Sequence, residues 1–156
     1  MKTLEVINKE EIESIINGCH VCFVGINNSD DCPYVIPMNF AYADGFVYLH
    51  SAPLGTHVKL LDKNPKVSIT FCLEGKLVYQ DVDVACSYRM KSKSVICNGE
   101  VEFVEDLDRK EEYLNLLMRK YTRKSFNFSL PALKNVKVWK VNLIKVSAKA
   151  FGQKHF

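Results

Sequence analysis

The sequence contains little of what marks a membrane or secreted protein. Its uninterrupted apolar stretches are short, such as 21–24, whereas a membrane-spanning helix needs about 20 apolar residues. The segment MKTLEVINKEEIE, residues 1–13, carries acidic side chains where a secretory signal has an apolar core. We therefore expect a cytoplasmic protein that does not associate with a membrane.

The sequence also lacks a complete cysteine or histidine pattern for a metal site. Cys19 and Cys22 form one CxxC pair, but neither a second CxxC nor a downstream pair of histidines accompanies it. In a reducing compartment cysteines remain free thiols more often than they form disulfides. We therefore expect all six cysteines to be free thiols and predict no metal.

Several common catalytic and nucleotide-binding motifs are absent. The chain contains no G-x-G-x-x-G, no Walker loop, no H-E-x-x-H and no G-x-S-x-G. Neither sign of charge is in large excess, since the net charge is +3. The basic residues concentrate in the second half, which leaves a polyanion-binding barrel as an alternative. Because the aromatic residues alternate with apolar ones as core residues do, we expect no nucleic-acid partner.

What the chain does contain is typical of one globular domain. Its 156 residues are 47% hydrophobic and 25% charged, so we expect a single domain over 1–156. Apolar residues at three- or four-residue steps predict helices, and alternating or continuous apolar runs predict strands. The expected helices cover about 8–18, 57–63 and 106–123. The expected strands cover 20–26, 34–42, 46–51, 67–73, 78–89, 95–104 and 136–148.

Local signals support several of these elements. Asn8 lies three residues before Glu11, as an N-cap does, and the Asp44-Gly45 pair predicts a hairpin turn. Gly99 is a candidate β-bulge. Many short strands with few helices favour a mainly β fold with some α-helix, an antiparallel barrel of six or so strands with peripheral helices.

Three segments carry the candidate chemistry. Pro37 lies inside an otherwise convincing strand, so that strand is an edge, or its backbone faces a ligand. The second segment runs from His50 and Ser51 through a loop of small residues to a helix that starts near Thr56. Free N–H groups at such a helix start suit a phosphate. The third segment, residues 92–101, contains Ser94-Val95 and resembles an ordinary strand when taken alone.

Taken together and in this order, the segments resemble the pyridoxamine 5′-phosphate oxidase-like family of FMN-binding split barrels, and within it the 5-nitroimidazole-resistance branch. The matching motifs are Pro37-Met38-Asn39, Tyr48-Leu49-His50-Ser51-Ala52, Gly55-Thr56-His57, Asn64-Pro65 and Ser94-Val95-Ile96-Cys97-Asn98-Gly99. The resemblance covers nearly the whole chain.

The resemblance implies a split-barrel homodimer with two flavins at its interface. By this analogy Pro37, Met38 and Asn39 offer backbone to the isoalloxazine, and Ser94 and Val95 form the other wall. The flavin and phosphate region would be lined by His50, Ser51, Ala52, Gly55, Thr56 and His57. The expected cofactor is FMN, with FAD as the alternative.

The implied function is reduction of a nitroaromatic or similar small acceptor, with a reductant such as NAD(P)H and His50 as catalytic proton donor. The alternative is a non-catalytic flavin carrier or sensor. Two positions depart from the family pattern. Thr56-His57 stands where relatives carry a lysine or basic pair, and because a histidine is only partly charged near neutral pH we expect pH-sensitive flavin retention. Residues 151–154 lack the Arg-x-His substrate motif of pyridoxamine phosphate oxidases, so vitamin B6 synthesis is not expected.

Overall fold

A computed structural model describes residues 2–29 and 31–153; Lys154, at the end of the 151–154 segment, lies outside them. The helices are α1 (Lys9–Gly18), α2 (Thr56–Lys63), α3 (Leu107–Thr122) and α4 (Leu130–Lys134), with a short 3₁₀ turn at Ala85–Ser87. The strands are β1 (Lys2–Val6), β2 (Cys22–Ile26), β3 (Tyr34–Met38), β4 (Phe40–Ala43), β5 (Phe46–Ser51), β6 (Lys66–Cys72), β7 (Lys76–Val78), β8 (Arg89–Val104) and β9 (Lys137–Gln153).

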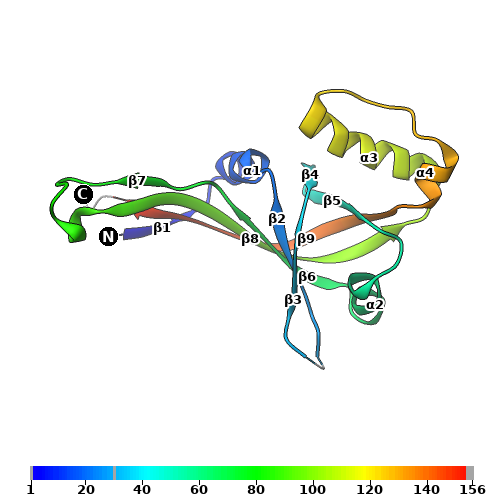
Figure 1. Ribbon diagram of the computed structural model, residues 1–156, viewed down its shortest axis with the longest axis horizontal. Coiled ribbons are helices and arrows are strands. Elements are labelled where there is room, and N and C mark those ends of the chain that lie inside the picture. The colour runs from blue at the N-terminus through cyan, green and yellow to red at the C-terminus, as the bar shows by residue number, and fades with distance from the viewer. Residues whose placement is uncertain (1, 30, 154–156) are drawn as a thin grey trace.

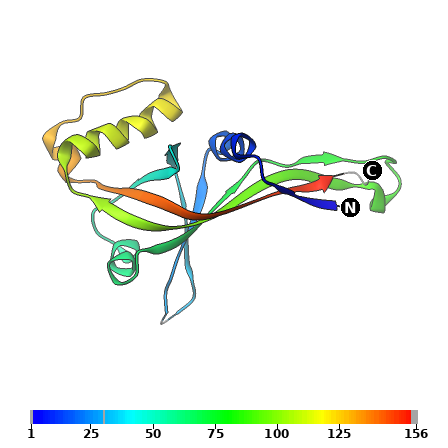
Figure 2. The same ribbon diagram turned by 180° about the vertical axis from the view of Figure 1, so that it is seen from behind.

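The strands form one curled antiparallel sheet, which confirms the predicted split-barrel class. Its order is β3-β2-β6-β8-β9-β5-β4, with β1 added to β9 and β7 to β8. The described residues thus contain nine strands rather than about six. Figure 1 shows α3 and α4 on one side of the sheet and α2 on the other. The long strands β8 and β9 run through the barrel and continue as an arm that also holds β1 and β7 (Figure 2).

Two apolar clusters pack on opposite faces of the sheet. The larger one fills the barrel and centres on fully buried side chains such as Trp139, Phe40 and Phe71. The smaller one joins α3 to β4 and β5 through Tyr48, Tyr113 and other apolar residues. Tyr48 and Tyr113 have ring centroids 4.5 Å apart. Burial on both faces explains why β5 is apolar along most of its length.

Several local predictions are confirmed. The Asn8 side chain accepts a hydrogen bond from the Glu11 backbone N–H at 2.8 Å and caps α1. β4 and β5 form the hairpin, with Asp44 and Gly45 both at positive φ. The pairing of β8 with β9 shifts register at Gly99, where a Cβ would lie 2.5 Å from a backbone oxygen of β9. A side chain at that bulge would therefore collide with the neighbouring strand.

The predicted strand 34–42 is corrected, because the chain breaks at Asn39. Its first half, β3, pairs with β2 and is an edge strand, which accounts for Pro37. Its second half, β4, pairs with β5 at the opposite edge of the sheet. Asn39 is therefore the corner at which the chain passes from one edge of the sheet to the other.

The predicted strand 78–89 is wrong for most of its length. Only its first residue, Val78, which ends β7, and its last, Arg89, which begins β8, are strand, and the segment between them is a loop with the 3₁₀ turn. Val82 and Val84 are 63% and 47% exposed, so their alternation does not mark a buried face. Sequence analysis also missed β1 and the five-residue helix α4.

The six cysteines are free thiols, as predicted. Among the residues that the structure describes, His, Cys, Asp and Glu side chains do not gather in groups of three or more that could hold a metal ion. Within the same part of the chain, each helix is too short or too polar to cross a bilayer.

Candidate functional site

The end of β5 brings Ser51 against Trp139, a side chain from a distant part of the chain. The indole Nε1 of Trp139, on β9, donates a hydrogen bond to Ser51 Oγ at 3.0 Å. The Ser51 hydroxyl in turn donates to the Ala52 carbonyl oxygen at 2.9 Å. The His57 ring stacks on Trp139, with centroids 5.7 Å apart and planes 29° apart. Ser51 and His57, two predicted site residues, therefore share one buried indole as their support.

The start of α2 depends on Gly55. Its φ of +147° is a conformation that L side chains rarely adopt, and a Cβ there would lie 2.8 Å from the His57 ring. Gly55 is the N-cap of α2 but has no side chain to cap it, and Thr56 begins the helix with its side chain exposed. The first N–H groups of α2 thus lie beside His57 without a side-chain cap.

A lysine lies opposite Ser51 on the neighbouring strand. Lys137 pairs directly with Ser51 across β5 and β9. Its Nζ lies 2.8 Å from Glu105 Oε1 and 4.8 Å from the Phe103 ring centroid. The hydrogen bond from Lys137 lowers the pKa of Glu105, so that carboxylate stays charged at neutral pH. The motif comparison did not identify Lys137 or Trp139, which lie more than 80 residues further along the chain than Ser51.

His50 belongs to the opposite face of β5, because side chains alternate along a strand. It pairs with Val138, whose side chain packs in the cluster under α3. Part of the His50 ring is open to solvent, yet desolvation on this face lowers its pKa below the ordinary 6.5. His50 is therefore mainly a neutral imidazole at pH 7, with one nitrogen that can donate a hydrogen bond and one that can accept, and it must take up a proton before it acts as an acid.

Asn39 lies at the same end of the β4–β5 hairpin as His50. The pairing of β4 with β5 ends at Phe40 and Leu49, and Asn39 and His50 are the next residues along the chain on either side. The Asn39 side chain donates to the His20 carbonyl at 3.3 Å. Tyr121, at the end of α3, also donates to that carbonyl at 2.6 Å and accepts from the Phe40 N–H at 3.1 Å. These bonds fix the corner of the sheet against α3.

The other predicted residues divide between the exposed surface and the core. Pro37 is exposed and pairs with Phe23, whereas Met38 is 9% exposed and packs in the barrel. Val95 is fully buried, so it can offer no side chain to a ligand. Ser94 is partly exposed on β8. His50 and Val104 of β8 both pair with Val138 of β9, so Ser94 lies about ten residues, or about 33 Å along the strand, from the level of His50. One chain therefore does not bring Ser94 to His50 or His57.

The chain is similar to a known protein family and to a solved structure. A family model described as pyridoxamine 5′-phosphate oxidase matches residues 8–150. The structure of a proposed 5-nitroimidazole antibiotic resistance protein from Bacteroides thetaiotaomicron has 47% identity over 96% of this chain and 87% of that one, with a TM-score of 0.88. No match to a curated protein was found.

Two more distant structures share the fold. The flavocytochrome Anf3 of Azotobacter vinelandii has 21% identity over 96% of this chain and 70% of that one, with a TM-score of 0.80. An FAD- and heme-binding protein of Mycobacterium smegmatis has 16% identity over 97% of this chain and 76% of that one, with a TM-score of 0.81. At these identities the likeness concerns the fold alone.

Proposed function

The chain belongs to the pyridoxamine 5′-phosphate oxidase family, and we propose that it is a flavin-dependent oxidoreductase that reduces a nitroaromatic acceptor such as a 5-nitroimidazole. The observation that carries this proposal is the 47% identity, over 96% of the chain, to a proposed 5-nitroimidazole resistance protein. A bound flavin would accept a hydride from a reductant such as NAD(P)H and supply the electrons.

The residues at the start of α2 fit the phosphate of such a cofactor. The Ser51 hydroxyl and the His57 ring both contact Trp139, uncapped N–H groups follow Gly55, and Lys137 stands opposite Ser51 as a nearby cation. Gly55 keeps His57 in place, since any larger residue would displace the ring. FMN is the proposed cofactor by the family resemblance, and FAD is the alternative.

His57 and Lys137 are candidates to take the role of the lysine that relatives carry at the start of this helix. Lys59 lies on α2 with its side chain exposed, whereas Lys137 is opposite Ser51 and 23% exposed at its side chain. We propose that Lys137 supplies the positive charge and that His57 positions the phosphate. Flavin affinity that weakens on Lys137→Met, but not on Lys59→Met, supports this assignment; the reverse order contradicts it.

A homodimer completes the site in this proposal. Val35, Phe23 and Ile96 are 47–59% exposed, and strand pairing places them on the same face of the sheet as Ser94 and Pro37. A second copy that covers this apolar face would also bring its own Ser94 toward the corner at Asn39, which one chain does not achieve. A monomer at micromolar concentration in sedimentation would contradict this arrangement.

His50 is the proposed proton donor. His50 is at the same end of the β4–β5 hairpin as Asn39, whose backbone we expect to meet the flavin. Because the ring is mainly neutral at pH 7, it would take up a proton from water at one nitrogen and pass a proton to the reduced acceptor. Loss of general acid catalysis costs about 10² to 10⁴ in rate, so His50→Ala should reduce nitroreduction by at least about 100-fold while the flavin stays bound. The exposed His20→Ala serves as the matched control.

The assay measures NAD(P)H-dependent loss of 2-methyl-5-nitroimidazole by wild type, His50→Ala and His20→Ala, with flavin content determined on each sample. We expect turnover in wild type and His20→Ala only. Turnover by His50→Ala equal to wild type would reject the role of His50. Flavin-loaded wild-type protein that reduces no nitro compound would instead indicate the non-catalytic carrier or sensor.

A further inference from the structure

An apolar cavity of about 210 Å³ lies between the His50 face of β5 and helices α3 and α4. His50 is at its edge, and the rest of its described lining is apolar: Leu114, Leu117, Met118, Phe128, Ala132 and Val136. We call it the α3 pocket. Leu114 and Leu117 also belong to the core under α3, so one wall of the pocket is part of the packed interior.

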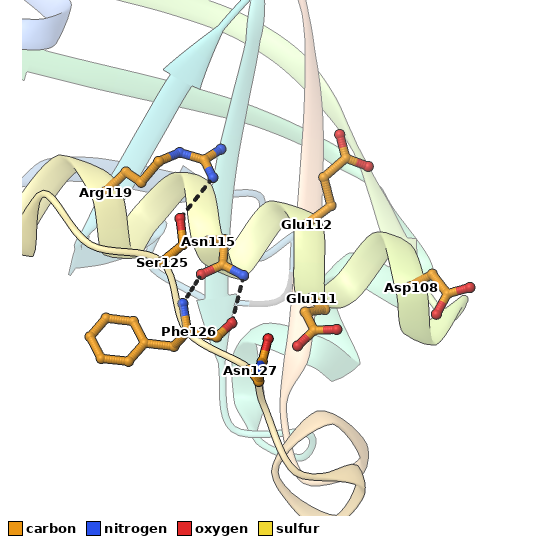
Figure 3. Close-up of a pocket in the computed structure, with 8 residues that line it drawn as sticks. All are labelled: Asp108, Glu111, Glu112, Asn115, Arg119, Ser125, Phe126 and Asn127. Atoms are coloured by element: carbon orange, nitrogen blue, oxygen red, sulfur yellow. Dashed lines mark hydrogen bonds between the residues drawn. The ribbon is translucent and has the colours of Figure 1, made fainter.

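Hydrogen bonds hold the other wall, which is the loop that follows α3. The Asn115 side chain accepts from the Phe126 N–H at 2.7 Å and donates to the Phe126 carbonyl at 2.9 Å. Figure 3 shows this pair on the outer side of α3, together with the bond from Arg119 to Ser125. Glu111 Oε1 accepts from the Phe128 N–H at 2.8 Å. The loop is thus fastened along α3, and Phe128 is fixed against the pocket.

A buried lysine fixes α4 and the start of β9. Lys110 is 5% exposed, and its Nζ donates to the carbonyl oxygens of Leu133 at 3.3 Å and Val136 at 3.1 Å. These bonds hold the backbone beside Ala132 and Val136, two lining residues. With both walls fastened by hydrogen bonds, the pocket is preformed, which reduces the cost of ordering a site when a ligand binds.

The size of the pocket limits what it can hold. A dry apolar cavity of about 150 Å³ accepts a benzene molecule, whereas pockets for drug-sized ligands begin at about 300 Å³. At about 210 Å³, the α3 pocket accommodates one aromatic ring with small substituents, whereas a fused ring system would not fit wholly inside it. Its apolar lining favours an uncharged ligand, because a charge would lose its hydration there.

His50 gives the pocket its single polar contact. No hydrogen bond from the His50 ring to another described residue is present, so its N–H is available to a ligand. Oxygen atoms of a nitro group and the unsubstituted nitrogen of an imidazole are acceptors for such a donor. His50, at the edge of the pocket, follows the last residue of β5 that pairs with β4, at the end of the hairpin where the corner at Asn39 lies and where we propose that the flavin binds.

We infer that the α3 pocket binds the ring of the acceptor, with His50 donating a hydrogen bond to it, and that the pocket selects uncharged monocyclic nitroheteroaromatics over bicyclic ones. Ala132 and Phe128 determine the size limit. This inference rests on the proposed function, because it assigns the substrate class to the same site. It extends that function by placing specificity in α3, α4 and their connecting loop, outside the motifs that indicate flavin binding.

The test measures binding to the oxidised, flavin-bound protein without a reductant, by ligand-observed NMR titration. The probes are 2-methyl-5-nitroimidazole and 2-methyl-5-nitrobenzimidazole, which has an additional fused benzene ring that carries the nitro group. We expect the monocyclic probe to bind at least about tenfold more tightly, since a surplus group in a fixed apolar pocket typically changes affinity by tenfold or more.

Two variants change the pocket in opposite directions. Ala132→Leu fills it and should weaken binding of the monocyclic probe by about tenfold, whereas Phe128→Leu enlarges it and should improve binding of the bicyclic probe. Ala85→Leu makes the same change as Ala132→Leu at an exposed position on the distant 3₁₀ turn and should change neither affinity. Melting curves recorded on each variant identify any that fails to fold. If one pocket variant does not fold, the binding measurements on the other pocket variant decide the outcome.

The outcomes distinguish the pocket from the function. Equal affinities for the two probes, or monocyclic binding that neither pocket variant alters, would overturn the assignment of the pocket. Flavin content is measured on the same samples. Protein that contains no flavin and takes up none contradicts the proposed function, whereas flavin-loaded protein without ring selectivity contradicts only the inference about the α3 pocket.

Discussion

The replacement Lys120→Met tests how burial of a lysine at the corner of the sheet affects stability. The Lys120 Nζ lies 3.4 Å from the centroid of the Phe40 ring and has no hydrogen-bond partner among the described residues. Burial lowers the pKa of Lys120 from 10.5 to about 8, against a smaller opposing effect of the Cys19 and Cys22 thiols. Methionine keeps the apolar length of the side chain and removes the charge.

The difference between the two pKa values corresponds to about 3 kcal/mol. Because part of the lysine remains open to solvent, we expect about 1–2 kcal/mol of this difference to affect folding. The unfolded chain keeps the proton up to about pH 10.5, whereas the folded chain loses it near pH 8. The unfolded state therefore binds more protons between these values, and the stability of the wild type should rise with pH in that window.

Guanidinium unfolding of wild type and Lys120→Met at pH 7 and pH 10, at one protein concentration, measures this effect. The wild type should gain about 1–2 kcal/mol relative to the variant over this interval. Titration of other groups affects both proteins and cancels in the comparison. The exposed Lys124→Met should show no such pH dependence. A stability difference between wild type and Lys120→Met that is the same at both pH values would refute the argument.

Two further substitutions test the start of α2. Gly55→Ala should displace His57 and weaken flavin binding in fluorescence titrations. Gly45→Ala, also at positive φ but in open space, should leave flavin affinity unchanged. Equal losses of affinity in the two variants would contradict the role of the contact with His57. Ser51→Ala leaves the buried Trp139 N–H without a partner and should cost about 1–3 kcal/mol of unfolding free energy. Urea unfolding, followed by the fluorescence emission of the single tryptophan, measures this loss. An unchanged unfolding midpoint would show that the hydrogen bond contributes little to stability.

Local signals in the sequence predict the parts of the fold that depend on local chemistry. The Asn8 cap, the Asp44-Gly45 turn and the Gly99 bulge each depend on a few neighbouring residues, and all three are confirmed. The alternation over 78–89 fails as a prediction because a strand also needs a neighbour, and the segment around Val82 has none. Strand 34–42 fails at Asn39 because the barrel closes there, which only the complete sheet determines.

The site was predictable as a set of segments but not as a geometry. Motif order identified His50, Ser51 and His57, yet strand alternation places His50 on the α3 face and Ser51 on the Trp139 face. Lys137 and Trp139 reach Ser51 through strand pairing over a long sequence separation, for which the sequence contains no local signal. The α3 pocket likewise forms from an α4 helix that the apolar periodicity did not indicate, because five residues are too few to show it.

The central claim, that this chain binds a flavin, is tested most directly by the absorbance spectrum of the purified protein. The cradle at the start of α2 predicts a yellow protein with a flavin band near 450 nm that releases FMN on denaturation, at about one flavin per chain. Release of FAD instead would retain the flavin and correct only its identity. A colourless protein that takes up neither FMN nor FAD when either is added would contradict the account.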